Sequence, residues 1–173
     1  MLKEKRQIIE VLFMAVDLFV VTVAWLLSYW IRFKTDFVPA DKGIPPFFEY
    51  ISVAPLIWLI WGLVFKQMGL YKPMRGVRRT KELFQLLNAN ALALLLFIAA
   101  VYLLREKTVP YSRLVFVYFG LFALILTVIQ RICVRGTLRE LRRKGFNLRY
   151  MIIVGEGKVA EDIVNKIRGH QEL

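Results

Sequence analysis

Four long apolar stretches constrain this sequence more than any other feature, because each is long enough, or almost long enough, to cross a bilayer. They cover about residues 11–31, 47–65, 83–104 and 110–130, and a spanning helix needs roughly 20 mostly apolar residues. The first stretch contains one charged residue, Asp17, and the third contains none. We predict four transmembrane helices, with a kink at Pro55 because proline removes a backbone hydrogen bond. The fourth helix is predicted to begin at Pro110, since proline is favoured in a first helical turn.

The composition agrees with a membrane protein and excludes several enzyme classes. Hydrophobic residues make up 58% of the 173 residues, against roughly 45–50% in average soluble proteins. A single cysteine, Cys133, excludes an intrachain disulfide, and a single histidine, His170, excludes His-rich metal sites and histidine-based catalytic triads. We therefore assign no metal site, no cofactor of its own and no catalytic residue to this chain.

The distribution of basic residues predicts the orientation of the four helices. Three basic residues precede the first stretch, six lie between residues 66 and 82, and seven lie between residues 131 and 149. The two other connecting loops, 32–50 and 105–113, carry three each. Cytoplasmic loops carry the excess of Lys and Arg in membrane proteins. The predicted fold of residues 1–130 is therefore an all-α bundle of four transmembrane helices with both termini in the cytoplasm.

The formal net charge of +12 does not indicate a nucleic-acid partner. The basic residues flank apolar stretches, where they set topology and attract anionic lipid headgroups. The expected partners are membrane lipids, and we exclude nucleic acid.

Residues 131–147 are predicted to form a basic amphipathic helix and linker next to the membrane. Arg131, Arg135, Arg139 and Arg142 recur at helical spacing, and the helix is expected to stop at Gly145. Two interpretations remain open for this segment. It is either a solvated basic helix that fixes topology, or a cradle for a lipid phosphate formed by Arg135, Arg139, Arg142 and Arg143.

Residues 148–173 change in composition and predict the start of a Rossmann-like α/β domain. A short run of β-branched and aromatic residues ends at Val154, and a glycine-rich turn and a helical pattern follow. The turn has the spacing G-x-G-x-x-A through Gly155, Gly157 and Ala160, which suits a dinucleotide phosphate. Glu156 lies within the turn and would repel that phosphate, so two interpretations remain open: the turn binds a dinucleotide, or it is purely structural. One βα unit cannot bury its own core, and we expect the chain to end within this domain.

Several polar side chains lie within the predicted spans, on the cytoplasmic side. The candidate intramembrane cluster is Asp17, Asn88, Asn90, Gln130 and Arg131. Ionisable residues inside a membrane are functional candidates by default, but polar side chains also hold helices together in lipid. The cluster is therefore interpreted either as a contact between helices or as a surface facing a substrate.

The succession of short motifs along the chain resembles the N-terminal half of the polyprenyl-phosphate hexose-1-phosphate transferases, the bacterial enzymes that initiate exopolysaccharide and O-antigen synthesis. The resemblance covers essentially the whole chain. It is carried by Asp17, the run Ser28, Tyr29, Trp30, Ile31, Arg32, Phe33, then Gly69, Leu70, Tyr71 with Arg75 and Glu82, then Tyr111, Ser112, Arg113, and finally Gly145 to Arg149 with Ile152 to Gly157 and Arg168 to Leu173.

This resemblance implies an architecture of four membrane helices, a cytoplasmic Rossmann-like domain and a C-terminal phosphoglycosyltransferase domain. In that last domain an Asp–Glu pair and a magnesium ion transfer a sugar phosphate to undecaprenyl phosphate. The catalytic domain is absent from these 173 residues. The resemblance therefore implies a chain that contributes membrane anchoring, homo-oligomerisation and regulation, in the bacterial inner membrane, near polyprenyl phosphate.

Two other functions remain open. A membrane-bound nucleotide-sugar dehydratase or epimerase is similar through four spans and a first Rossmann-like domain, although such enzymes often show Pro-Arg-Ser where this chain has Pro110, Tyr111, Ser112 and Arg113. A non-enzymatic four-span lipid-handling or scaffold protein is the second alternative, but it does not require a glycine-rich turn at its end.

Overall fold

The structure is a computed structural model that describes residues 2–35, 44–71, 79–104 and 112–143, together with Gly157 and Asp162. The described helices are α1 (Leu2–Lys34), α2 (Phe47–Ile51), α3 (Ala54–Gln67), α4 (Arg79–Leu104) and α5 (Arg113–Arg143). The chain divides into a first unit, Met1–Gln130, and a second unit, Arg131–Leu173. The strand and helix predicted over residues 148–173 lie outside the described residues, apart from Gly157 and Asp162.

Four helical segments are long and apolar enough to cross a membrane, as the sequence predicts. They cover Glu10–Lys34, Phe47–Gln67, Thr80–Leu104 and Arg113–Thr137. The second of these segments is made of α2 and α3, so the kink predicted at Pro55 is instead a break between two helices. The chain turns at Ser52 and Val53, and Pro55 lies in the first turn of α3, where its missing N–H costs no hydrogen bond.

The fourth segment differs from its predicted bounds at both ends. α5 begins at Arg113 rather than at Pro110. The carbonyl of Ser112 accepts a hydrogen bond from the Val115 N–H at 3.0 Å, which places serine directly before the helix, a position it favours. The helix then continues to Arg143, so residues 131–143 of the predicted basic helix and linker belong to α5.

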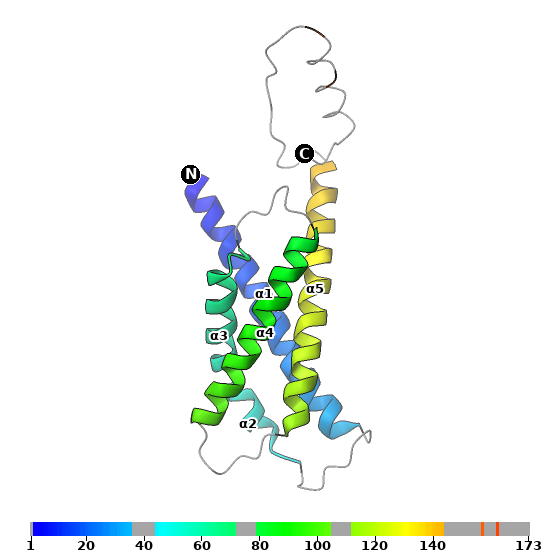
Figure 1. The fold of residues 1–173 in the computed structure, drawn as a ribbon. Helices are drawn as coiled ribbons and strands as arrows, with labels where there is room; N and C mark the ends of the chain where they lie inside the picture. The colour runs from blue at the N-terminus through cyan, green and yellow to red at the C-terminus, as the bar shows by residue number, and fades with distance from the viewer. Residues whose placement is uncertain are drawn as a thin grey trace. The chain divides into compact units, whose positions relative to one another are not determined.

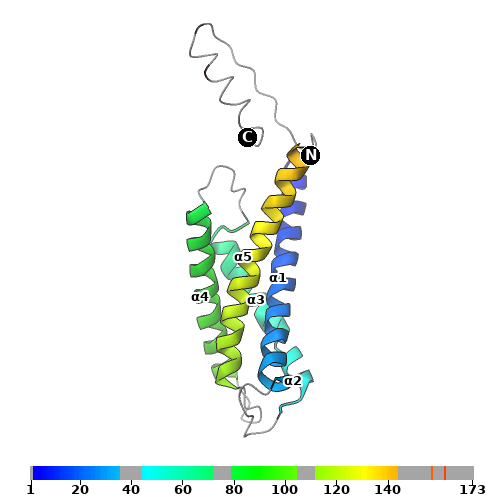
Figure 2. The same ribbon diagram turned by 90° about the vertical axis from the view of Figure 1, so that its right-hand side faces the viewer.

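The first unit is a bundle in which successive spans run in opposite directions. α1 and α4 run one way, and α3 and the first part of α5 run the other way (Figure 1). α3 packs against both α1 and α4, and a second view shows the same neighbours (Figure 2). The start of α1, the end of α3 and the start of α4 therefore lie at one end of the bundle.

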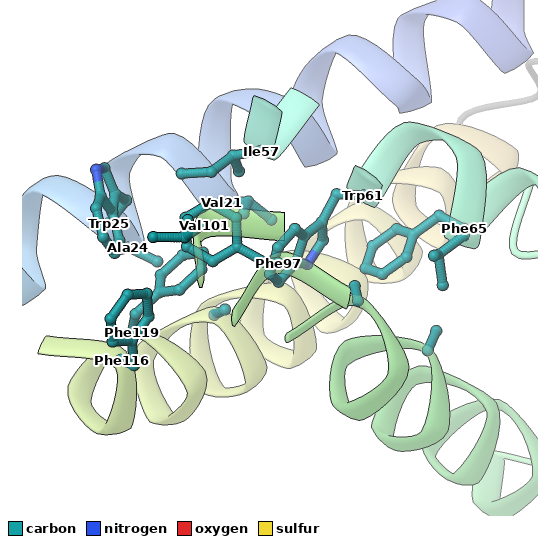
Figure 3. Packing of buried hydrophobic residues seen from close by; sticks show 14 of the residues in the cluster. Val21, Ala24, Trp25, Ile57, Trp61, Phe65, Phe97, Val101, Phe116 and Phe119 are labelled. Carbon is teal, nitrogen blue, oxygen red and sulfur yellow. The ribbon is translucent and has the colours of Figure 1, made fainter. Parts of the chain in front are cut away.

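Large rings fill the centre of the bundle and connect α5 to the other helices. We call Trp25, Tyr50, Phe97, Phe116 and Phe119 the aromatic layer; all are buried. The Trp25 ring stacks on Tyr50 at 5.3 Å between centroids and meets the edges of Phe97 at 5.3 Å and Phe119 at 5.1 Å. Its indole N–H donates to the Tyr50 carbonyl at 2.8 Å. Figure 3 shows Phe116 and Phe119 beside Trp25, with Trp61 further along the bundle beside Phe97.

The end of α3 is fixed by a glycine in the left-handed conformation. Gly69 has a φ of 72°, and its N–H donates to the Lys66 carbonyl while the Leu70 N–H donates to the Phe65 carbonyl. These two bonds form a Schellman motif, in which a residue with a side chain is disfavoured at the glycine position. Leu70 and Phe65 are both buried and belong to the same hydrophobic core, as is common where a Schellman motif ends a helix.

Gly69→Ala is expected to lower the free energy of unfolding by about 1–2 kcal/mol, the cost of placing a Cβ in the left-handed region. The measurement is unfolding by SDS titration in mixed micelles. Gly136→Ala is the control, because Gly136 lies within α5 and a Cβ there meets no atom within 4 Å. That change should stabilise the helix slightly. Equal effects of the two changes would contradict the assigned role of Gly69.

Candidate functional site

Buried polar side chains gather in one part of the first unit. The exposed fractions are 1% for Asp17, 5% for Asn90, 0% for Thr127 and 8% for Gln130. Asp17 belongs to α1, Asn90 to α4, and the other two to α5. Asp17 lies about 10 Å along α1 from the start of its span at Glu10, at 1.5 Å per residue.

The packing of the aromatic layer places Asp17, Asn90 and Thr127 at one level of the bundle. Trp25 contacts both Phe97 of α4 and Phe119 of α5. α1 and α4 run in the same direction. Asp17 lies eight residues before Trp25 on α1, and Ala89, the neighbour of Asn90, lies eight residues before Phe97 on α4. α5 runs in the opposite direction, and Thr127 lies eight residues after Phe119 on this helix. This level lies about 12 Å from the aromatic layer.

Trp61 of α3 reaches the same level. On α1, Asp17 lies between Met14 and Thr22. A Cβ on Gly62 would meet the end of Met14 at 2.7 Å, and the Trp58 indole N–H donates to the Thr22 hydroxyl at 2.8 Å. Trp61, between Trp58 and Gly62, is therefore level with Asp17. We call Asp17, Trp61, Asn90 and Thr127 the polar layer.

Asn90 is the centre of the hydrogen bonds in the polar layer. Its carbonyl oxygen accepts from the Trp61 indole N–H at 3.2 Å. Its amide nitrogen donates to the Leu86 carbonyl at 2.9 Å and to the Thr127 hydroxyl at 3.3 Å. The Thr127 hydroxyl in turn donates to the Ala123 carbonyl at 2.6 Å. One amide thus joins α3, α4 and α5 through buried groups.

Gln130 lies one turn beyond Thr127 on α5. Its amide nitrogen and oxygen are buried and make no hydrogen bond with the described residues. Nearer the end of the bundle, the Gln85 amide donates to the Met68 carbonyl at the end of α3, at 2.9 Å. Glu82, in the first turn of α4, is also buried.

The remaining predicted site residues are placed as follows. Asn88 is exposed on α4, two residues from the buried Asn90. Arg131 begins the second unit and is 9% exposed, and Arg135 is half-buried. Arg139, Arg142 and Arg143 belong to α5, but their side chains lie outside the described residues. In the predicted glycine turn, Gly157 has a φ of 103°, whereas Gly155 and Ala160 lie outside the described residues.

The polar layer supplies hydrogen-bonding groups and a carboxyl group. Among the described residues no group of three or more His, Cys, Asp or Glu side chains is arranged to hold a metal ion. Trp61 and Thr127 were not singled out in the sequence. A threonine or tryptophan in an apolar span does not by itself indicate a polar site. The spacing of eight residues between Phe119 and Thr127 equals the spacing between Asp17 and Trp25, and this match would have placed Thr127 level with Asp17.

Comparison with known protein families gives a match. A family model described as a CoA-binding domain matches residues 66–173. No curated protein and no solved structure matches the chain. The match begins at the end of α3 and includes α4 and α5, so it covers membrane-spanning helices as well as the residues that follow them.

Proposed function

This chain belongs to the family of CoA-binding domains, and on that premise we propose that it forms the membrane-anchoring and oligomerisation portion of a bacterial enzyme that transfers a sugar phosphate to a polyprenyl phosphate. Domains of this family are found in bacterial sugar transferases with a Rossmann-like fold. The observation that carries the proposal is the extent of the match, which joins two membrane spans to the predicted Rossmann-like segment.

The proposed location is the bacterial inner membrane, with both termini in the cytoplasm. The excess of Lys and Arg before α1, between α3 and α4, and after the fourth span supports this orientation. The same orientation places Arg135, Arg139, Arg142 and Arg143 where they meet anionic lipid headgroups. In the proposed enzyme this basic segment fixes topology, and it lies near the lipid phosphate that accepts the sugar phosphate.

The family description names coenzyme A, but the residues of the predicted turn fit this ligand only in part. The positive φ of Gly157, with no atom within 4 Å of an added Cβ, suits a backbone that approaches a diphosphate. Glu156 adds a negative charge to the same turn, which opposes a diphosphate. We therefore propose a structural role for the turn, and coenzyme A has no part in the proposed function.

We propose that the polar layer holds the helices together rather than contacting the substrate. The hydrogen bonds of Asn90 all go to groups of the bundle itself, as expected of polar contacts that join helices in lipid.

Asp17→Leu is expected to leave the transfer activity of the full-length protein unchanged per amount of folded protein, because the leucine side chain suits an apolar bundle and no substrate contact is lost. The measurement is the transfer of labelled sugar phosphate to polyprenyl phosphate in membranes, corrected for protein abundance. Loss of activity at normal abundance would contradict a purely structural role and assign Asp17 to substrate binding.

The proposal is tested directly by the intact mass of the native protein and by the reading frame after the codon for Leu173. We expect a frame that continues into a broken hydrophobic helix and an Asp–Glu pair. A second glycine-rich turn followed by a Tyr-x-x-x-Lys pair would instead identify a nucleotide-sugar dehydratase or epimerase.

A further inference from the structure

The outward face of α4 carries an amide within a membrane span. Asn88 is exposed and makes no hydrogen bond with the described residues. It lies about 12 Å along the helix from the start of the span at Thr80, too far for its short side chain to reach the headgroup region. An amide without a partner is costly in hydrocarbon, so this position calls for a polar partner from outside the bundle.

Exposed residues recur around Asn88 at the spacing of a helix–helix contact. We call Phe84, Asn88, Ala91 and Leu95 the outer seam of α4; all four are exposed. Their spacing of four, three and four residues is that of alternating a and d positions in a heptad. The opposite face of α4, with Ala89, Ala93 and Phe97, is buried in its own bundle. The small Ala91 in the outer seam allows another helix to approach closely.

The chemistry of the amide identifies the occupant of the outer seam. An amide carries a donor and an acceptor, so two Asn88 side chains brought together by a twofold axis along the membrane normal satisfy each other. A lipid tail offers no such groups. A polar asparagine at a single a position also fixes the register of paired helices.

We propose that the outer seam is the contact between two copies of this chain, with α4 packed against α4 and the two Asn88 amides hydrogen-bonded to each other. The inference deepens the oligomerisation role proposed above and rests on it, but it requires only insertion in a membrane. Its test therefore uses no enzymatic activity, and its failure is distinguishable from failure of the transferase proposal.

The experiment is disulfide crosslinking of the full-length protein in native membranes, with other cysteines, including Cys133, replaced by alanine. Ala91→Cys places a thiol in the outer seam. Leu96→Cys is the matched control, because Leu96 is also exposed on α4 but points about 110° away from the centre of the seam at 100° per residue. We expect a dimer of twice the chain mass from Ala91→Cys and no dimer from Leu96→Cys.

The role of the amide is tested in the Ala91→Cys protein. Asn88→Leu should lower the dimer affinity roughly tenfold, the loss expected for hydrogen bonds between membrane helices, whereas Asn88→Gln should retain the dimer. Because Asn88 is exposed, a leucine there leaves the bundle intact. Any of four results would overturn the proposal. These are equal crosslinking at both cysteine positions, an undiminished dimer with Asn88→Leu, no dimer at all, and an adduct with a different protein.

Discussion

Trp25→Ala should destabilise the bundle more than any other single change that we consider. Trp25 is fully buried, contacts rings from α2, α4 and α5, and donates a hydrogen bond to the Tyr50 carbonyl. Lipid tails are as apolar as the core, so burial of Trp25 gains no hydrophobic free energy. It stabilises the bundle through close packing with the other rings. Removing the indole leaves a cavity at the point where α5 joins the other helices. By comparison with Trp→Ala changes in soluble cores, we expect a loss of about 3–5 kcal/mol.

The measurement is the free energy of unfolding by SDS titration in mixed micelles, followed by circular dichroism. Trp30→Ala is the matched control, since Trp30 lies five residues further along α1 and is 57% exposed. That change should cost little stability. A loss of less than about 1 kcal/mol for Trp25→Ala, or an equal loss for both tryptophans, would show that the aromatic layer does not hold the bundle together.

Asn90→Leu is expected to have the second largest effect, a loss of about 2 kcal/mol, near the upper limit for hydrogen bonds between membrane helices. The leucine removes the acceptor of the Trp61 indole N–H and the donor to the Thr127 hydroxyl. The indole N–H is then left buried without its partner, which adds a desolvation cost to the lost bonds. The same SDS titration measures this loss.

A double-mutant cycle isolates the bond between Asn90 and Thr127. If the two side chains interact as described, the losses for Asn90→Leu and Thr127→Val are not additive. Thr137→Val is the control for the threonine change, because both hydroxyls donate to the carbonyl four residues earlier but Thr137 is exposed. Additive losses, or equal effects of the two threonine changes, would contradict a polar layer centred on Asn90.

The four spans were predictable from the sequence because length and apolarity are local properties. The bounds were less predictable. Pro55 within an apolar run indicates a disturbed helix, but a kink and a break differ only in how the neighbouring residues pack. The helical spacing of Arg131, Arg135, Arg139 and Arg142 predicts a helix after Gln130, and α5 continues to Arg143.

The buried polar side chains of the first unit were predictable only in part. Asp17, Asn90 and Gln130 were selected by depth along their spans, and all three are buried. Depth does not separate Asn88 from Asn90, which lie two residues apart and therefore about 200° apart around the helix. The small residues Ala89 and Ala93, followed by Phe97, mark the buried face of α4 by their spacing of four residues. That pattern assigns Asn90 to the bundle and Asn88 to the outer surface.

The most direct test of the central proposal is the product formed by membranes that contain the full-length protein, incubated with a nucleotide sugar labelled in its sugar phosphate and with undecaprenyl phosphate. We expect label in the organic phase as a lipid-linked sugar diphosphate, with release of the nucleoside monophosphate. A nucleotide sugar that stays water-soluble but has lost water or changed configuration would contradict the transferase function and identify a dehydratase or epimerase.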